Sequence, residues 1–250
     1  FMQKYHPMGS LAPRDVVARS IDHELKISGE EFVYLDITHK DPKEVMSHFP
    51  NIYKKCLSIG IDLTKDIIPV VPAAHYCCGG IKVNLNGESS IRRLYALGEA
   101  SSTGLHGGNR LASNSMMEAA VYADAAARHA ISVIDSIELQ RDIPAWDYEG
   151  TAVPEEMALI TQDYKEMQQI MSNYVGIVRS DVRLERAKRR LEIIFKETEE
   201  LYLKSTLSQH LCELRNMIAV GYLIIKQAEA RHESVGLHYS IDYPAKPVEI

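Results

Sequence analysis

The sequence predicts an α+β fold that ends in a three-helix bundle, and two observations support this. Up to about Asp142, short runs of β-branched and aromatic residues alternate with segments of helical periodicity, as in mixed domains. After a linker of turn-forming composition at 144–150, apolar residues recur at helical spacing in three successive segments. These changes divide the chain into zones of residues 1–68, 69–142 and 143–250.

The first zone is predicted to contain helices and one strand. Helix-period apolar residues follow Pro13, which favours the first turn of a helix. The β-branched and aromatic run at 32–37 predicts a strand. Two further helices are predicted over 42–49 and 51–59, the second of them ending at Gly60.

The second zone is predicted to mix strands, a glycine-rich loop and a long helix. The segments of strand composition are residues 67–71, 80–84 and 94–97. Asn86 and Gly87 form the dipeptide most typical of a hairpin turn. The glycine-rich loop at 98–108 leads into a predicted helix over 114–135 that is rich in alanine and methionine.

The third zone is predicted to be helical throughout, with a loose tail marked by Gly236 and Pro244. Three sets of apolar residues each fall on one face of a helix, so the three helices can bury one another. The sets are Met157, Ile160, Tyr164, Met167 and Met171; Leu184, Ala187, Leu191, Ile194 and Phe195; and Leu207, Leu211, Leu214, Ile218, Tyr222 and Ile225.

Composition narrows the possible functions. A formal net charge of -6 argues against non-specific binding to nucleic acid or to an anionic membrane, and no apolar run has the length of a membrane span. The chain opens at Phe1 with neither an export signal nor an obvious element, which predicts a cytoplasmic protein and a piece of a longer chain. No zinc spacing occurs, so no metal site is predicted and reduced thiols are expected at Cys56, Cys77, Cys78 and Cys212.

The glycine-rich loop is the first candidate site. Glycines allow a backbone to approach a ligand closely, and the N-terminus of the following helix offers free N–H groups with a partial positive charge. Such a site suits a phosphate or a flavin anion, and Glu99, at the start of the loop after a predicted strand, could accept hydrogen bonds from sugar-type hydroxyls. A merely flexible glycine loop is the alternative, which the flanking Glu99 and the helix disfavour.

Three cationic or imidazole side chains are the second candidate site. Arg14 begins a helix, His75 lies between a strand and a Gly-Gly turn, and Arg110 follows the glycine-rich loop. Each alone is explained as a structural or solvated residue. Together they would form a pocket for a small dicarboxylate, because the arginine fork matches carboxylate geometry.

Four segments carry a family resemblance that covers nearly the whole chain. They are LAPRDVVAR (11–19), PAAHY (72–76), GEASSTGLHGGNRLASNS (98–115) and RHESVGLH (231–238) followed by DYP (242–244). These segments resemble the succinate dehydrogenase/fumarate reductase flavoprotein family. The resemblance implies that residues 1–68 are the C-terminal part of a capping domain, 69–142 the C-terminal part of an FAD-binding domain, and 143–250 a helical C-terminal domain.

The resemblance also implies roles for individual residues. Arg14 would be the active-site proton-transfer residue, either as an acid or base or only as a group that holds the substrate. His75 and Arg110 would bind the substrate carboxylates. Glu99 would bind the sugar-like portion of FAD, and Ser115 and Met116 would meet the flavin ring with backbone N–H groups. The family usually has leucine in place of Met116 and arginine in place of Val235.

The implied activity is FAD-dependent oxidation of L-aspartate to iminoaspartate, with O2 or fumarate as acceptor. This is the first step of de novo NAD biosynthesis, where functional coupling to quinolinate synthase is expected. The family's dinucleotide-binding GxGxxG is absent from the chain, so the chain alone is expected to be inactive and to hold little FAD. One alternative is the flavoprotein subunit of a fumarate reductase or succinate dehydrogenase, which docks on an iron–sulfur subunit, and another is a non-catalytic helical interaction module. Within the shared motif, the residues at 103–106 and 111–113 favour the aspartate-oxidising enzyme over the other family members.

Overall fold

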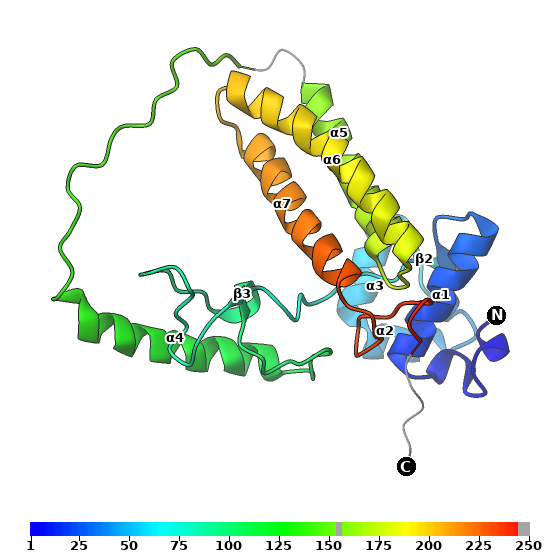
Figure 1. Cartoon of the computed structure of the whole chain (residues 1–250). Coiled ribbons are helices and arrows are strands. Elements are labelled where there is room, and N and C mark those ends of the chain that lie inside the picture. The colour runs from blue at the N-terminus through cyan, green and yellow to red at the C-terminus, as the bar shows by residue number, and fades with distance from the viewer. Residues whose placement is uncertain (154–156, 245–250) are drawn as a thin grey trace. The chain divides into compact units, whose positions relative to one another are not determined.

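The computed structural model describes residues 1–153 and 157–244 (Figure 1). The chain forms two compact units, Phe1–Ala74 and His75–Ile250. The part of the predicted tail beyond residue 244 lies outside the described residues. No helix in the described ranges combines the length and the hydropathy that crossing a bilayer requires.

The first unit contains the predicted helices and two strands, which pair in an antiparallel sheet that the sequence did not predict. The elements are the 3-10 turns η1 (Met2–Lys4) and η2 (Gly9–Leu11), helices α1 (Arg14–Ser28), α2 (Pro42–His48) and α3 (Pro50–Leu57), and strands β1 (Val33–Leu35) and β2 (Ile68–Val70). Helix α1 ends where Gly29 adopts a φ of 77° and donates to the carbonyl of Leu25, which few other residues could do without strain. The Asp41 carboxylate caps α2, and Pro42 occupies its first turn.

The first part of the second unit contains little regular structure before its long helix. Strand β3 (Ile81–Lys82) pairs in parallel with β4 (Ser101–Ser102), and the short helix η3 (Gly98–Ala100) precedes β4. Helix α4 (Asn114–Ile134) matches the predicted long helix.

The strand predicted at 94–97 is wrong. The predicted turn at Gly87 is present, with a φ of 73° and a hydrogen bond from its N–H to the Asn84 carbonyl. A second turn follows, because the Leu94 N–H bonds to the carbonyl of Ile91. That turn leaves Tyr95 only an isolated bridge to Glu88, which is too short for a ladder.

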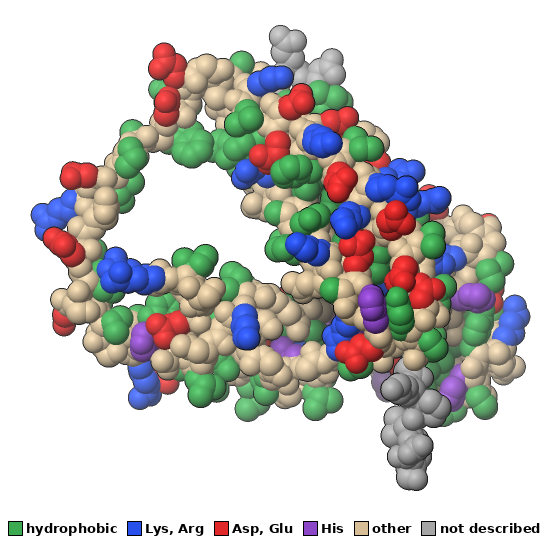
Figure 2. All heavy atoms as spheres, viewed as in Figure 1, with side chains coloured by type: hydrophobic (Ala, Val, Ile, Leu, Met, Phe, Trp, Pro, Cys, Tyr) green, Lys and Arg blue, Asp and Glu red, His purple; other side chains and the backbone are tan. Residues whose placement is uncertain are grey.

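The rest of the second unit is helical. Its elements are α5 (Met157–Ile170), which continues into the π-turn η4 (Met171–Val175), then α6 (Asp181–Lys204) and α7 (Gln209–Glu229). Ser180 and Ser208 cap α6 and α7 by accepting from a backbone N–H three residues ahead. All three helices contribute to one buried apolar core, while acidic and basic side chains alternate over the outer face of α6 (Figure 2). The core consists of Ile160, Met167, Ile170, Val175, Leu184, Ala187, Leu191, Ile194, Leu211, Leu214, Ile218, Ile225 and Ala228.

Four residues expected in this core are exposed instead. Met157, Phe195 and Tyr222 are 43%, 49% and 38% exposed, because each lies at the margin of its helix's apolar stripe. Leu207 is 39% exposed and precedes the first residue of α7. Thr198, which the apolar pattern does not include, is instead only 1% exposed. Its hydroxyl oxygen has no hydrogen-bond partner among the described residues.

Thr198→Val is expected to raise the free energy of unfolding by about 1–2 kcal/mol. A buried hydroxyl without a partner costs roughly this much, and valine has a similar shape without the polar atom. Urea denaturation followed by far-UV circular dichroism measures the change. The control Thr198→Ser keeps the hydroxyl and removes the methyl group, so it should destabilise the chain by about 1 kcal/mol. A valine variant no more stable than the parent would show that the hydroxyl is satisfied.

Residues 231–243, which we call the C-terminal clasp, fold back onto the start of α6. The backbone of Arg179 pairs with Tyr239 and Ile241 on either side, at 3.0 Å each. The Arg179 guanidinium donates to His238 Nδ1 at 2.7 Å, and His238 Nε2 lies 3.1 Å from the Arg231 carbonyl. Since Arg179 can only donate, His238 is held as the neutral tautomer with its proton on Nε2.

The clasp is expected to lose stability as the pH falls below 6.5. Burial, and then the charge of Arg179, lower the pKa of His238 from its usual value of 6.5; the hydrogen bond to the Arg231 carbonyl and the charge of Glu233 oppose this, and the charge of Arg231 adds to it. The unfolded chain therefore binds a proton that the folded chain resists, so stability is complete above pH 6.5 and declines below it. Thermal melts across this range measure the effect. His238→Gln, which cannot titrate, should show a flatter pH dependence, and an unchanged slope would contradict the assignment.

Candidate functional site

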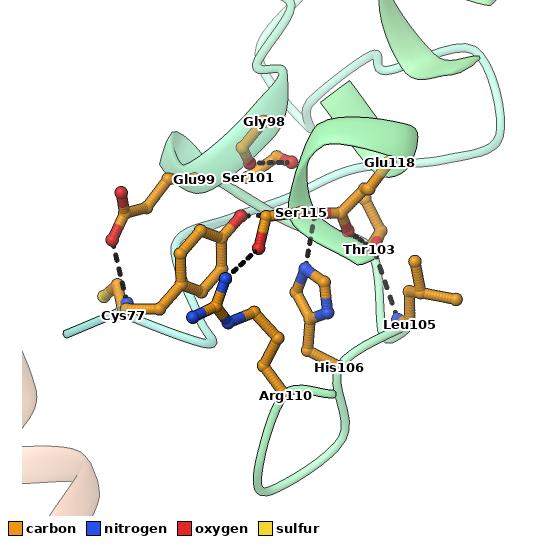
Figure 3. A network of polar contacts seen from close by, with 11 residues as sticks. Cys77, Gly98, Glu99, Ser101, Thr103, Leu105, His106, Arg110, Ser115 and Glu118 are labelled. Carbon is orange, nitrogen blue, oxygen red and sulfur yellow. Dashed lines mark hydrogen bonds and ion pairs between the residues drawn. The ribbon is translucent and has the colours of Figure 1, made fainter. Parts of the chain in front are cut away.

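A buried carboxylate organises the glycine-rich loop against α4 (Figure 3). Glu118, on the second turn of α4, is only 3% exposed. It accepts hydrogen bonds from the Thr103 hydroxyl, from His106 Nε2 at 2.7 Å and from the Tyr76 hydroxyl at 3.4 Å. His106 is itself buried, and its other ring nitrogen finds no partner in the described part of the chain. Segments far apart in sequence are thus fixed around one charge.

Arg110 lies beside this network and is half-buried. It donates from Nη1 to the Ser115 hydroxyl at 2.6 Å, and its guanidinium carbon lies 4.5 Å from the centre of the Tyr76 ring. The Tyr76 ring in turn meets the His106 ring edge to face, at 5.1 Å between centroids. Burial of the phenol, together with the negative charge of Glu118, raises the pKa of Tyr76, so its hydroxyl stays protonated as a donor.

The start of α4 has the features of an anion or cofactor site. Ser113 precedes the helix with a φ of 71°, and its side chain caps none of the helix's first N–H groups. Those N–H groups and the helix dipole attract oxygen-rich or anionic groups. Met116 is 80% exposed, so its side of the helix start is open to solvent.

Glu99 lies exposed at η3 and accepts one hydrogen bond, from the Cys77 backbone N–H at 3.0 Å. A carboxylate has room for several more donors, which suits ribityl or ribose hydroxyls. Together with the uncapped start of α4, this donor and acceptor set fits a flavin nucleotide. The residues that would hold it are Glu99 at the sugar-like portion and the N–H groups of Ser115 and Met116 at the ring.

The structure brings only some of the predicted site residues together. Arg110 and Ser115 are in contact, and Met116 is the next residue of the helix. His75 is exposed and directly precedes Tyr76 in the chain. Arg14 belongs to the first unit, where its guanidinium donates to the carbonyls of Ser10 and Ala12 at 2.6 and 2.7 Å. Those bonds fix Arg14 at the start of α1.

Sequence reasoning missed Tyr76, Thr103, His106 and Glu118 as members of the site. The sequence contained one signal for this site, because Glu118 is a charged residue near the N-terminal end of a helix that is otherwise rich in alanine and methionine. A charged residue on the buried side of such a helix requires partners, which the neighbouring loop supplies. The four cysteines are free thiols, and the described residues contain no cluster of His, Cys, Asp or Glu arranged for a metal ion.

Two family models together match most of the chain. Residues 1–116 match the family model described as an FAD binding domain, and residues 164–247 match the one described as fumarate reductase flavoprotein C-term. The L-aspartate oxidase of Yersinia pestis is 49% identical over 244 residues, which are 98% of this chain and 46% of that protein. A chloroplastic L-aspartate oxidase of Nicotiana tabacum is 44% identical over 98% of this chain and 40% of its own length.

The fold comparison gives the same family. A solved quinol-fumarate reductase with menaquinol molecules superposes with a TM-score of 0.79 at 26% identity, covering 100% of this chain and 49% of that one. This chain therefore spans less than half the length of the relatives it matches. The two family models, the relatives and the shared fold establish that the chain belongs to the succinate dehydrogenase/fumarate reductase flavoprotein family.

Proposed function

We propose that the chain forms part of an L-aspartate oxidase, which oxidises L-aspartate to iminoaspartate with FAD and passes the electrons to O2 or fumarate. Relatives of that name cover 98% of the chain. The observation that carries the proposal is Arg110, a cation held by Tyr76 and Ser115 at the uncapped start of α4. That placement puts a carboxylate-binding group beside the residues suited to a flavin.

Each side chain has a task that its chemistry permits. The bound flavin supplies the redox chemistry. Arg110 and His75 bind the substrate carboxylates, and Arg110 offers the planar fork that two carboxylate oxygens prefer. Arg14 holds and polarises the substrate, or delivers a proton in the fumarate direction, since a guanidinium resists acting as a base.

The domain assignment follows the same proposal. Residues 1–68 are part of the capping domain, 69–142 part of the FAD-binding domain, and 143–250 a helical domain whose three helices form a bundle. The enzyme would act in the cytoplasm in the first step toward quinolinate and NAD, functionally coupled to quinolinate synthase. The shared apolar core of α5, α6 and α7 supports a helical domain that folds by itself.

A fumarate reductase or succinate dehydrogenase flavoprotein subunit is the second candidate, because solved quinol-fumarate reductase shares the fold. One assay separates the two functions. A protein of the relatives' full length that contains this chain should contain FAD and release peroxide when given L-aspartate in air, and succinate should not replace L-aspartate. Succinate oxidation without aspartate oxidation would favour the second candidate. Absence of bound flavin in that protein would reject both candidates in favour of a non-catalytic module.

A further inference from the structure

We propose that Glu118 is a positioning residue for Arg110, acting through Tyr76, and that it thereby determines how tightly the enzyme holds a substrate carboxylate. This inference rests on the proposed function and assigns a task to the buried network beside the site. The chain of contacts runs from Glu118 to the Tyr76 hydroxyl, and from the Tyr76 ring to the Arg110 guanidinium.

Arg110 is held in one orientation by its neighbours. A free arginine side chain samples many rotamers, and fixing it on binding costs affinity, so a guanidinium fixed beforehand binds a carboxylate more tightly. Here one N–H bond, to Ser115, holds the fork at its edge, and the Tyr76 ring supports its face. This leaves guanidinium N–H groups for a ligand, since arginine has five such donors.

Tyr76 needs support of its own. Residues 71–78 form no helix or strand, so no backbone ladder fixes the orientation of the ring. Side-chain contacts do this instead: the hydroxyl donates to Glu118 at 3.4 Å, it is also hydrogen-bonded to Ser115, and the His106 ring packs edge to face against the phenol. Losing the Glu118 acceptor would loosen the phenol and shift the surface under Arg110.

Stability alone does not explain why a carboxylate lies in this position. Glu118 is 3% exposed and His106 9%, and one ring nitrogen of His106 has no partner in the described part of the chain. Burying a charge and leaving a polar atom unsatisfied both reduce stability, and apolar residues of similar volume often replace such groups without loss. The network is therefore better explained by the orientation it gives Tyr76 and Arg110 than by its contribution to stability.

The test is steady-state kinetics of the full-length, FAD-loaded oxidase that contains this chain. Tyr76→Phe keeps the ring under Arg110 but removes the hydroxyl, and Glu118→Gln removes the charged acceptor. Each is expected to raise KM for L-aspartate about threefold to tenfold, the scale of one hydrogen bond, with little change in kcat or FAD content. The matched control is Tyr95→Phe, which removes a hydroxyl bonded to His129 farther along α4 and should leave KM unchanged.

A double-mutant cycle separates positioning from a general structural role. In an Arg110→Leu background, Tyr76→Phe should have almost no further effect on kcat/KM, because the group it positions is gone. Additive effects of the two substitutions would overturn the inference and leave the proposed function intact. Normal aspartate kinetics of Arg110→Leu alone would instead reject the substrate role of Arg110. Should Glu118→Gln fail to fold, the cycle with Tyr76→Phe still decides.

Discussion

Arg110→Leu is expected to lower kcat/KM for L-aspartate at least roughly 30-fold in the proposed full-length oxidase. This corresponds to a loss of about 2 kcal/mol of transition-state stabilisation. The substrate has two anionic groups, and each loses water when it enters the site, so each needs a fixed cationic or donor partner. Leucine fills the space of the side chain but leaves one carboxylate unpaired. Flavin content should not change, because the flavin is assigned to Glu99 and to backbone N–H groups of Ser115 and Met116.

Two companion variants sharpen this result. Arg110→Lys keeps the charge and loses the planar fork that stacks on Tyr76, so its kcat/KM should fall between those of the parent and Arg110→Leu. Arg128→Leu removes an arginine of α4 that is paired with Asp124 and largely exposed, and its kinetics should match the parent. Kinetics of Arg110→Leu indistinguishable from those of Arg128→Leu would show that Arg110 does not bind substrate.

Gly236→Ala is expected to lower the free energy of unfolding of the second unit by at least about 2 kcal/mol. Gly236 has a φ of 60°, which costs any other residue strain, and a methyl group there would lie 2.2 Å from the Gly108 carbonyl oxygen. The same carbonyl accepts from the Leu237 N–H at 2.9 Å, so the clasp and the glycine-rich loop are joined at this point by backbone alone. Neither backbone can yield without breaking that bond.

The effect should reach the site, because Gly108 lies two residues before Arg110. Aspartate kcat/KM should therefore fall together with the melting temperature. Gly150→Ala is the matched control. Gly150 has a φ of 80°, but an added methyl group there would meet nothing within 4 Å, so this variant has the backbone strain without the clash. It should lower the free energy of unfolding by about 1 kcal/mol. Equal losses of unfolding free energy in the two variants would show that the close approach of clasp and loop contributes nothing to stability.

The helices could be predicted from sequence because their signals are local. The predicted long helix at 114–135 and the observed α4, Asn114–Ile134, differ by one residue. Strands of two or three residues are harder to predict, because they form only where a pairing partner is present. Ile81 pairs in parallel with Ser101, which is distant in sequence, and the local residue pattern does not predict this contact. The apolar run at 94–97 has no such partner strand and forms no strand itself.

The candidate site also contains contacts between residues near in sequence, which could be predicted, and contacts between distant residues, which could not. Arg110 and Ser115 are five residues apart, so a loop that enters a helix brings them together, and the motif that contains both is readable in sequence. Tyr76 and Glu118 are 42 residues apart, and only the folded chain shows that they meet. The sequence could indicate a cationic pocket, but it could not show which groups hold the arginine in place.

We infer that the start of α4 and Arg110 form one site for flavin and dicarboxylate. The decisive measurement is a crystal structure of the full-length protein that contains this chain, with FAD and a dicarboxylate ligand bound. We expect Arg110, His75 and Arg14 to converge on the ligand, with Arg110 and His75 at hydrogen-bond distance from its carboxylates. We also expect the flavin ring to lie against the N–H groups of Ser115 and Met116. Three side chains pointing into different cavities, or a flavin bound away from α4, would overturn this inference.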